Sequence, residues 1–340
     1  MRLIQADFSK SLGKRSIVEP AVGTLNISHN KTQKLQSMTA QTKGLLAAVG
    51  AYLCWGFMPL YWALFGGVRG WEVIGHRVLW SLILISAFLM LIGRFSELFS
   101  TLRTFKKQPI QYFNLFAAAP IAAINWWINV YAATSNQVVE LGIGMFLTPL
   151  FTVALGVVFF RERLSRLKQL SVFLPFLGVC IMIYTLGRMP WIALGVSSSW
   201  ALYGVFKKRL GIDPWVSNAL EASLMLPFAI AYLFYLDANG VGAFLAGGTY
   251  ITILLISVGL VTSVPMIAFS AAANVLPLTI LGFIQYMNPI LTLIVGLVFF
   301  HEPFNHQQLI PLLFIWAGIL TFIYSEFKEK AARKVQAARA

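Results

Sequence analysis

The sequence has few charged residues and a large excess of apolar ones. Only 11% of its 340 residues are charged, whereas 58% are hydrophobic, and the mean hydropathy is +0.75. A soluble domain carries about a quarter charged residues, so this chain cannot cover an apolar core with a polar surface of its own. The composition therefore excludes an ordinary soluble protein and predicts an integral membrane protein.

Motifs for catalysis, cofactors and metals are also missing. The two cysteines, Cys54 and Cys180, lie in apolar runs and form no metal-ligand spacing with the histidines. The stretch HEPFNH (301–306) is not an H-E-x-x-H motif, because its histidines are five positions apart and a proline intervenes. There is no P-loop to bind ATP. We therefore expect no catalytic residues, no cofactor and no metal.

Long apolar segments dominate what is present. A spanning helix needs about 20 mostly apolar residues, and ten segments fit this requirement: 44–65, 71–93, 110–133, 138–160, 166–187, 190–208, 215–236, 248–272, 275–300 and 306–326. Short linkers join them, so we expect one all-α integral membrane bundle of ten transmembrane helices.

The net charge of +14 comes from basic residues that are distributed unevenly between the two sides of such a bundle. Alternate loops and the two tails hold every Lys and Arg except Arg69 and Arg188, which lie on the opposite side, and Arg77, which lies inside a span. Because cytoplasmic loops retain positive charge, both termini are predicted to be cytoplasmic. This distribution accounts for the basic character without a nucleic-acid partner.

The two tails are polar. Residues 1–43 lack the apolar core of a signal peptide, and we interpret them as a disordered cytoplasmic tail or as a start assigned too early, with Met38 as the alternative. Residues 327–340 are basic. They either lie on the anionic inner leaflet or form a solvated tail.

An internal repeat relates the two halves of the chain. Residues 141–164 align without a gap to residues 281–304, with 9 of 24 positions identical. This predicts two units, 44–187 and 188–326, of five spans each. Because five is an odd number, the second unit is expected to be inverted in the membrane, and a 5+5 inverted repeat indicates alternating-access transport.

Several stretches resemble a known family: GAYLCWGFMPLYW (50–62), HRVLWS (76–81), INWWINVYA (124–132), YGVFKKRL (203–210) and LGFIQYMNPIL (281–291). They are similar to the RarD-type permeases, also called chloramphenicol-sensitive proteins, among the EamA domains of the drug/metabolite transporter (DMT) superfamily. The resemblance covers about residues 43–324. It implies a ten-span permease of the bacterial inner membrane and leaves the substrate undefined.

Two ionisable residues stand out inside the second span. His76 and Arg77 are about six residues from its outer end, roughly 9 Å deep, where a charge is costly. Arg77 either extends to the interface, forms a structural pair, or contacts an anionic or polar substrate. When Trp71 is aligned with Trp215, Arg77 corresponds to Glu221, which is either a structural acid or, if protons drive transport, the proton carrier, with His76 as second choice.

Other polar and aromatic residues of the spans are candidates for a substrate cavity. The amides need partners in lipid, so they either connect helices or line a cavity, and the aromatic residues are either interfacial anchors or cavity walls. The candidates are Asn125, Trp126, Asn129, Gln285, Tyr286, Asn288, Tyr52, Trp55 and Tyr203. Pro149 and Pro289, at matching places in the repeat, are expected to break their helices near the site.

Together these features predict a secondary-active permease that moves small organic solutes, metabolites or drugs, with the substrate bound between the repeats. Its partners would be this small molecule and membrane lipids, with coupling to protons or by exchange. The alternative is a lipid-handling or scaffolding membrane protein without a solute path. A central cavity of a few hundred Å³ would favour the permease, and a dry, packed centre the alternative.

Overall fold

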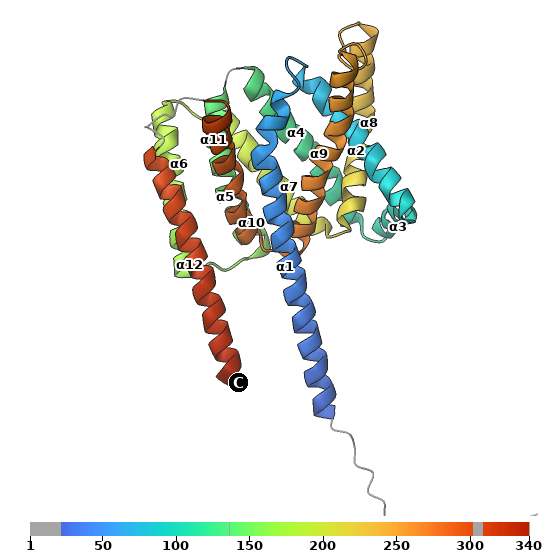
Figure 1. Cartoon of the computed structure of the whole chain (residues 1–340). Coiled ribbons are helices and arrows are strands. Elements are labelled where there is room, and N and C mark those ends of the chain that lie inside the picture. The colour runs from blue at the N-terminus through green and yellow to red at the C-terminus, as the bar shows by residue number, and fades with distance from the viewer. Residues whose placement is uncertain (1–21, 136, 302–308, 340) are drawn as a thin grey trace, which may run out of the picture. The chain divides into compact units, whose positions relative to one another are not determined.

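The computed structural model of the chain describes residues 22–135, 137–301 and 309–339, and in these ranges it contains helices and no strand (Figure 1). The helices are α1 (Val22–Ala63), α2 (Gly70–Leu91), α3 (Ser96–Phe105), α4 (Pro109–Thr134), α5 (Val138–Phe160), α6 (Arg166–Leu186), α7 (Trp191–Leu210), α8 (Pro214–Ala238), α9 (Gly248–Val275), α10 (Leu278–Gln285), α11 (Met287–Phe299) and α12 (Leu309–Arg339). The expected all-α class is confirmed.

Nine helical segments among the described residues are long and apolar enough to cross a membrane, with α10 and α11 counted as one segment. The expected tenth span, α7, is not among them. Its 20 residues correspond to about 30 Å, but Ser197–Ser199 and the terminal lysines lower its mean hydropathy. Such a helix suits a position inside the bundle, and α7 packs between α4 and α5.

The chain divides into two compact units, residues 1–40 and 41–340, and the bundle is formed by the second. Helix α1 begins at Val22, so residues 22–43, expected to belong to a disordered tail, are helical. No proline occurs between Val22 and Met58 to interrupt this helix. The rest of the expected tail, residues 1–21, lies outside the described residues. The basic segment at the other end of the chain continues α12 as far as Arg339.

Helix α3 was not expected from the sequence. It is too short to span a membrane and carries Leu98, Leu102 and Phe105 at helical spacing, of which Leu98 and Phe105 are buried. At its start, Arg94 bonds Glu97 (2.6 Å) and Asp213 (3.0 Å), the residue that caps α8. This amphipathic helix therefore fastens the connection between α2 and α4 to the start of α8.

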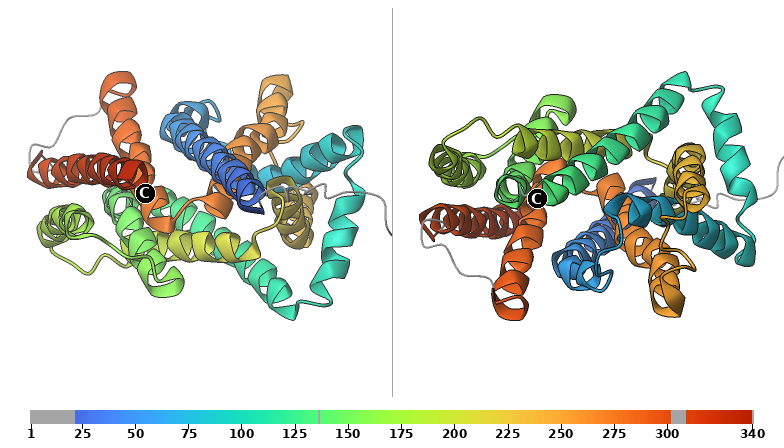
Figure 2. Two further views of the ribbon diagram at one scale, coloured as in Figure 1. Left: turned by 90° about the horizontal axis from the view of Figure 1, so that it is seen from below. Right: turned by 90° about the horizontal axis from the view of Figure 1, so that it is seen from above.

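Helices in corresponding places of the two halves pack against each other: α2 against α8, α5 against α10, and α6 against α12. The pair α6–α12 forms one edge of the bundle, and α3 lies at the opposite edge (Figure 2). Helices α6 and α12 approach each other closely, and each has a glycine at the contact. A Cβ added to Gly318 would lie 2.3 Å from Pro175, and one added to Gly178 would lie 2.7 Å from the Pro311 carbonyl, so both positions require glycine.

The two prolines expected to break helices lie in different surroundings. Helix α5 runs unbroken through Pro149, whereas the segment α10–α11 is interrupted for one residue at Tyr286, three residues before Pro289. Proline removes one backbone donor, but a membrane helix tolerates it where neighbours and hydroxyl side chains support the turn. In α5, Thr148 donates to the Gly144 carbonyl (2.7 Å), and α7 and α10 pack alongside.

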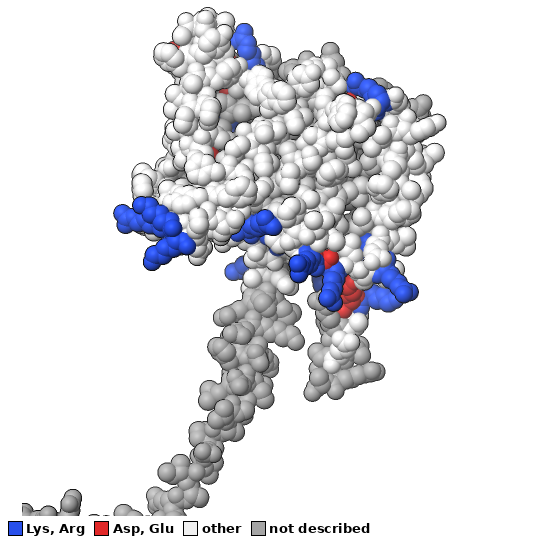
Figure 3. Space-filling view, turned by 180° about the vertical axis from the view of Figure 1, so that it is seen from behind, with Lys and Arg blue, Asp and Glu red and all other residues white. Residues whose placement is uncertain are grey.

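Basic residues gather at one end of the bundle, and few are seen at the other (Figure 3). The connections α2–α3–α4, α5–α6 and α7–α8 belong to the basic end. The connections α1–α2 and α6–α7 belong to the opposite end, where Arg69 and Arg188 are.

Candidate functional site

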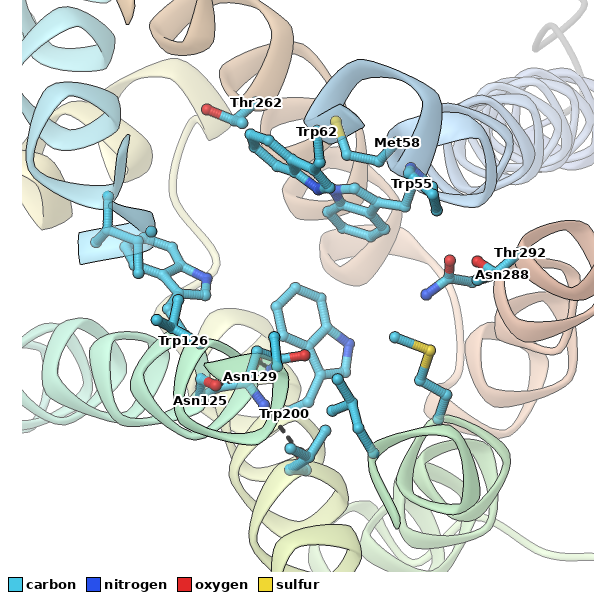
Figure 4. A pocket seen from close by; sticks show the side chains of 18 of the residues that line it. Trp55, Met58, Trp62, Asn125, Trp126, Asn129, Trp200, Thr262, Asn288 and Thr292 are labelled. Carbon is cyan, nitrogen blue, oxygen red and sulfur yellow. Dashed lines mark hydrogen bonds between the residues drawn. The ribbon is translucent and has the colours of Figure 1, made fainter. Parts of the chain in front are cut away.

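A cavity of about 520 Å³ lies inside the bundle between helices of both halves of the chain. Figure 4 shows side chains from α1, α4, α7, α9 and α11 surrounding an open centre. The main lining residues are Tyr52, Trp55, Met58, Trp62 and Phe65 near or in α1; Val73 and Arg77 in α2; Asn125, Trp126 and Asn129 in α4; Met145 and Thr148 in α5; Trp200 in α7; Thr262 and Met266 in α9; and Gln285, Asn288 and Thr292 in α10 and α11.

Helical periodicity explains which side chains reach this cavity. On α1, Trp55, Met58 and Trp62 recur every three or four residues and therefore share one face. On α2, Val73 and Arg77 likewise share a face and line the cavity. Each lining helix thus contributes a stripe of residues, which is the pattern of a pocket built between packed helices.

Arg77 is the one charged residue among the described residues that line the cavity. Its guanidinium carbon lies 3.7 Å from the ring centre of Trp126, also in the lining, an arrangement in which cation and ring attract. Within the described ranges Arg77 forms no ion pair. A positive charge stacked on an aromatic wall therefore faces the cavity.

His76 lies on another face of α2. It shares that face with Glu72 and Trp80, and the indole nitrogen of Trp80 donates to His76 Nδ1 (3.2 Å). Glu72 accepts from the backbone of Ala243 (2.5 Å) and Phe244 (3.1 Å), and the His76 ring is 4.7 Å from that of Phe244. Because one residue along a helix turns the side chain by about 100°, His76 contacts the α8–α9 connection and is not in the cavity lining.

The two amides of α4 both line the cavity and also connect helices. Asn125 donates to the Val196 carbonyl and the Ser199 hydroxyl of α7, both at 2.9 Å. Asn129 donates to the Asn125 carbonyl at 2.8 Å. The donors of these amides are thus used within the protein, and their position combines the two roles weighed from the sequence.

The polar side chains of α10 and α11 that line the cavity form fewer hydrogen bonds within the protein. Gln285 accepts from the Thr152 hydroxyl of α5 (3.2 Å), a bond that joins the two halves. The side chains of Asn288 and Thr292 form no hydrogen bond within the part of the chain that is described. In Figure 4 they lie across the open centre from Trp126, so these groups can bind a ligand.

Aromatic rings close the deep end of the cavity. Tyr52, Trp55 and Trp200 belong to the lining, and Tyr203 and Phe269 lie directly behind them, with neighbouring ring centres 5.3 to 6.3 Å apart. These five residues, from α1, α7 and α9, are called the aromatic floor below. Tyr203 is fully buried, so it supports the cavity from behind.

Glu221 lies beneath the floor in a buried network. It bonds the Lys207 ammonium at 2.7 Å, the Ser217 hydroxyl at 3.1 Å and the Tyr203 hydroxyl at 3.0 Å. The side chains of Lys207 and Glu221 are 2% and 5% exposed. Glu221 and Arg77 both line a second, smaller pocket of about 40 Å³. Glu221 is therefore near the cavity and outside its lining, with its charge balanced by Lys207.

Of the remaining expected site residues, Tyr286 lies outside the lining. Its ring packs near Phe283, with centres 6.2 Å apart, in a cluster with residues of α5, α6 and α12. Sequence reasoning missed Trp62, Trp200, Thr148, Thr262 and Thr292. Two of them could have been found from the sequence. Trp62 lies two helical turns after Trp55 and so shares its face of α1, and Thr148 precedes Asn288 by the repeat offset of 140 residues.

The chemistry of the lining fits a small organic molecule. Indoles, amides, hydroxyls and one guanidinium line the cavity, and its described residues include no His, Cys, Asp or Glu that would suit a metal. The volume lies within the range of ligand pockets, roughly 300 to 1,000 Å³. Fold and cavity together define a multi-pass membrane protein with an internal cavity.

The chain belongs to the EamA-like transporter family, whose sequence model matches it twice, over residues 42–184 and 188–324. This family has a ten-helix inverted-repeat fold, so the expected fold class and the resemblance stated above are confirmed. The protein is therefore a transporter. The unit bounds 44–187 and 188–326 stay predictions.

Two relatives are similar to this chain over nearly their whole length. An uncharacterized transporter of Bacillus subtilis, YojE, is 32% identical over 86% of this chain and 97% of its own. The protein RarD of Escherichia coli is 32% identical over 83% of this chain and 94% of its own. A solved crystal structure superimposes with a TM-score of 0.61 at 16% identity, covering 82% of this chain and 96% of that one, which supports the fold.

Proposed function

We propose that the protein is a secondary-active permease of the bacterial inner membrane that moves small organic solutes by alternating access. The observation that supports this most is the cavity, because helices of both halves build it and its lining combines aromatic walls with a few polar groups. Inverted-repeat transporters bind their substrates at such an interface. A packed centre, which would favour a scaffold, is not what the described residues form.

The distribution of basic residues supports an orientation with both termini in the cytoplasm. Loops rich in Lys and Arg stay on the cytoplasmic side, so the end with Arg69 and Arg188 faces outward. The lining extends to Phe65 and Val68 in the α1–α2 connection at this end. This conformation then corresponds to an outward-facing state, with the aromatic floor on the cytoplasmic side of the substrate.

Alternating access requires the floor to open when the outer end closes. The edge-on contact of Trp55 in α1 with Trp200 in α7, ring centres 5.3 Å apart, joins the first helices of the two repeats. Separation of α1 from α7 would open a path behind the cavity. Tyr203 and Phe269 would move with that opening, since they pack against the same rings.

Two forms of coupling fit the buried network. A proton on Glu221 would neutralise the partner of Lys207 and weaken the bond from Tyr203, which would loosen the floor. In the other form, exchange of one solute for another drives the cycle and Glu221 is structural. His76, the second candidate for a proton carrier, lies on the α8–α9 side of α2.

The test is transport by the full chain in sealed proteoliposomes with a panel of metabolites and drugs. A substrate-dependent flux is expected, driven by a pH gradient under proton coupling or by an opposing solute load under exchange. No flux of any solute under either condition would refute the permease.

Access can be measured separately with cysteine labels. Cys54 and Cys180 are exposed and are first replaced by serine. Thr292→Cys in the cavity is expected to react with an impermeant thiol reagent added outside and to be protected by a transported solute. The matched control Lys106→Cys, on the basic end, is expected to react only from inside. Labelling of both from the same side would contradict the proposed orientation.

A further inference from the structure

Arg77 differs from the two lysines of α7 in what balances its charge. Lys207 pairs with Glu221, and Lys208 donates to backbone carbonyls at the end of α9. Among the described residues, Arg77 stacks on the ring of Trp126 and has no carboxylate within ion-pair distance. The guanidinium donors therefore remain available to a ligand.

An uncompensated charge among membrane helices is unfavourable unless it meets water or a counter-charge. The cation–π contact with Trp126 attracts the guanidinium but uses none of its five N–H donors. Because Arg77 lines the cavity, an anionic group of a bound molecule can supply both the charge and the acceptors. Planar carboxylates match the fork of N–H groups on arginine.

The rest of the lining disfavours positive ligands. No Asp or Glu is found among the described lining residues, so an ammonium group in the cavity would have no counter-charge and would be repelled by Arg77. This disfavours cations directly. It also disfavours amino acids relative to the corresponding plain acids, because the ammonium would be desolvated without a partner.

The walls select a flat, apolar body. Trp55, Trp62, Trp126 and Trp200 line the cavity, and Figure 4 shows Trp55 and Trp62 on one side of the open centre and Trp200 on the other. Offset and edge-to-face contacts with such rings stabilise aromatic ligands beyond simple burial. Asn288 and Thr292, away from Trp126, suit a polar substituent at the far end.

We infer that the substrates are organic anions with a flat aromatic body, whose anionic group binds Arg77 while the ring lies among the four tryptophans. This inference rests on the proposed permease function and names its substrate class. Volume supports it as well, since about 520 Å³ accommodates a molecule of one to three rings within the range of ligand pockets.

The inference is tested by calorimetry, which measures the binding of four matched probes to the purified full chain in detergent. The probes are 2-naphthoate, the neutral 2-naphthamide, the non-aromatic decahydro-2-naphthoate and the cation 2-naphthylmethylammonium. We expect 2-naphthoate to bind about tenfold or more tightly than the amide, since a charged hydrogen-bond partner is worth at least this ratio. The non-aromatic acid should bind more weakly, and the cation should not bind.

Three variants assign the effect to the guanidinium. Arg77→Gln should abolish the preference for the acid over the amide, and Arg77→Lys should keep part of it, because the charge remains without the planar fork. Lys106→Gln, an exposed residue outside the bundle core, changes the net charge equally and should behave as the parent. Because Arg77 forms no ion pair with any described residue, Arg77→Gln should melt at or above the parent temperature, and this measurement checks that the variant folds.

Flux measurements separate the two proposals. Equal binding of acid and amide, or an acid preference that survives in Arg77→Gln, overturns the anion inference. If neutral or cationic solutes are then transported, the permease itself stands. Binding of 2-naphthoate that depends on Arg77, with no flux of any solute, leaves an anion site and refutes the permease. Flux of 2-naphthoate that is lost in Arg77→Gln supports both.

Discussion

Arg77 on α2 and Glu221 on α8 occupy equivalent places in the two repeats when Trp71 is aligned with Trp215, yet their surroundings are opposite. Glu221 is enclosed by Lys207, Ser217 and Tyr203. Arg77 stacks on a single indole and faces the cavity. The repeat therefore duplicates the helices and their packing, whereas the charges placed on them are specific to each half.

The same contrast holds along the pair α5 and α10–α11, at the offset of 140 residues. Met145 and Gln285 are equivalent, as are Thr148 and Asn288, and all four line the cavity. Symmetry thus brings matching positions to one pocket, but the second half presents amides where the first presents a thioether and a hydroxyl. A cavity of this kind gives a bound molecule one preferred orientation.

The largest effect is expected where the enclosed charge loses its partner. Glu221→Gln would leave the Lys207 ammonium, 2% exposed, without a counter-charge. Removing one member of a buried pair typically costs about 3–5 kcal/mol. The measurement is the free energy of unfolding in a mild detergent by chemical denaturation.

A double variant sharpens this prediction. Lys207→Met combined with Glu221→Leu removes both charges, and such replacements are close to neutral in stability, so this variant should recover most of the loss. If Glu221→Gln alone were as stable as the parent, the ion pair between Lys207 and Glu221 would not stabilise the fold, and the contrast with Arg77 would fail.

A smaller loss is expected at the link between the aromatic floor and the pair. Tyr203→Phe removes the hydroxyl that donates to Glu221 (3.0 Å) while the ring contacts remain. Hydrogen bonds to charged groups contribute about 1.5–3 kcal/mol, and we expect the lower value because Lys207 and Ser217 stay bound to the carboxylate.

Tyr286→Phe is the matched control for this substitution. The Tyr286 hydroxyl is buried and has no hydrogen-bond partner among the described residues, so its removal should leave the stability unchanged or raise it. Equal losses in the two variants would show that the bond from Tyr203 to Glu221 does not contribute.

Much of the fold could be predicted from the sequence, since it follows from composition and repetition. Runs of apolar residues give the spans, the offset of 140 residues gives the two halves, and the inversion follows from the odd number of spans. Helix α3 was not predicted because a segment of ten residues with four apolar positions, among them Leu98 and Phe105, resembles a polar loop. The helical structure of residues 22–43 was not predicted, because a polar composition alone does not prevent a helix.

The candidate site was harder to predict from the sequence. Whether a side chain reaches the cavity depends on the rotation of its helix, which hydropathy does not determine. His76 and Arg77 are neighbours, but only Arg77 lines the cavity. The ion pair between Glu221 and Lys207 was not predicted, because the basic residues near the end of the span 190–208 were assigned to the following loop, although Lys207 is 2% exposed. Trp200 could have been identified as one helical turn from Tyr203.

A still smaller effect is expected for the bond that joins the repeats across the cavity. Thr152→Val removes a hydroxyl that donates to the Thr148 carbonyl of its own helix (2.9 Å) and to Gln285 across the repeats (3.2 Å). Hydrogen bonds between membrane helices average about 0.6 kcal/mol, and the loss should be of this size. A double-mutant cycle with Gln285→Met, which introduces the residue found at the equivalent position 145, isolates the contact with Gln285, and its coupling energy should be of this size. A coupling energy near zero would mean that the bond to Gln285 does not contribute.

The smallest effect is expected for an acid–base pair exposed to water, which completes the contrast with the buried one. The hydrogen bond from Arg94 holds the pKa of Glu97 below its usual value, and the same bond raises the pKa of Arg94. A lowered carboxyl pKa means that the pair stabilises the folded state at pH values above the ordinary carboxyl pKa near 4.5. This contribution is lost as the pH falls through the lowered pKa.

Because the side chains of Arg94 and Glu97 are 37% and 39% exposed, water and salt weaken their attraction. Melting temperatures of the parent and Glu97→Gln should therefore differ slightly at about pH 7, converge as the pH falls through the lowered pKa of Glu97, and differ less in about 1 M salt. A drop at neutral pH as large as that of Glu221→Gln would mean that burial is not what distinguishes the two pairs.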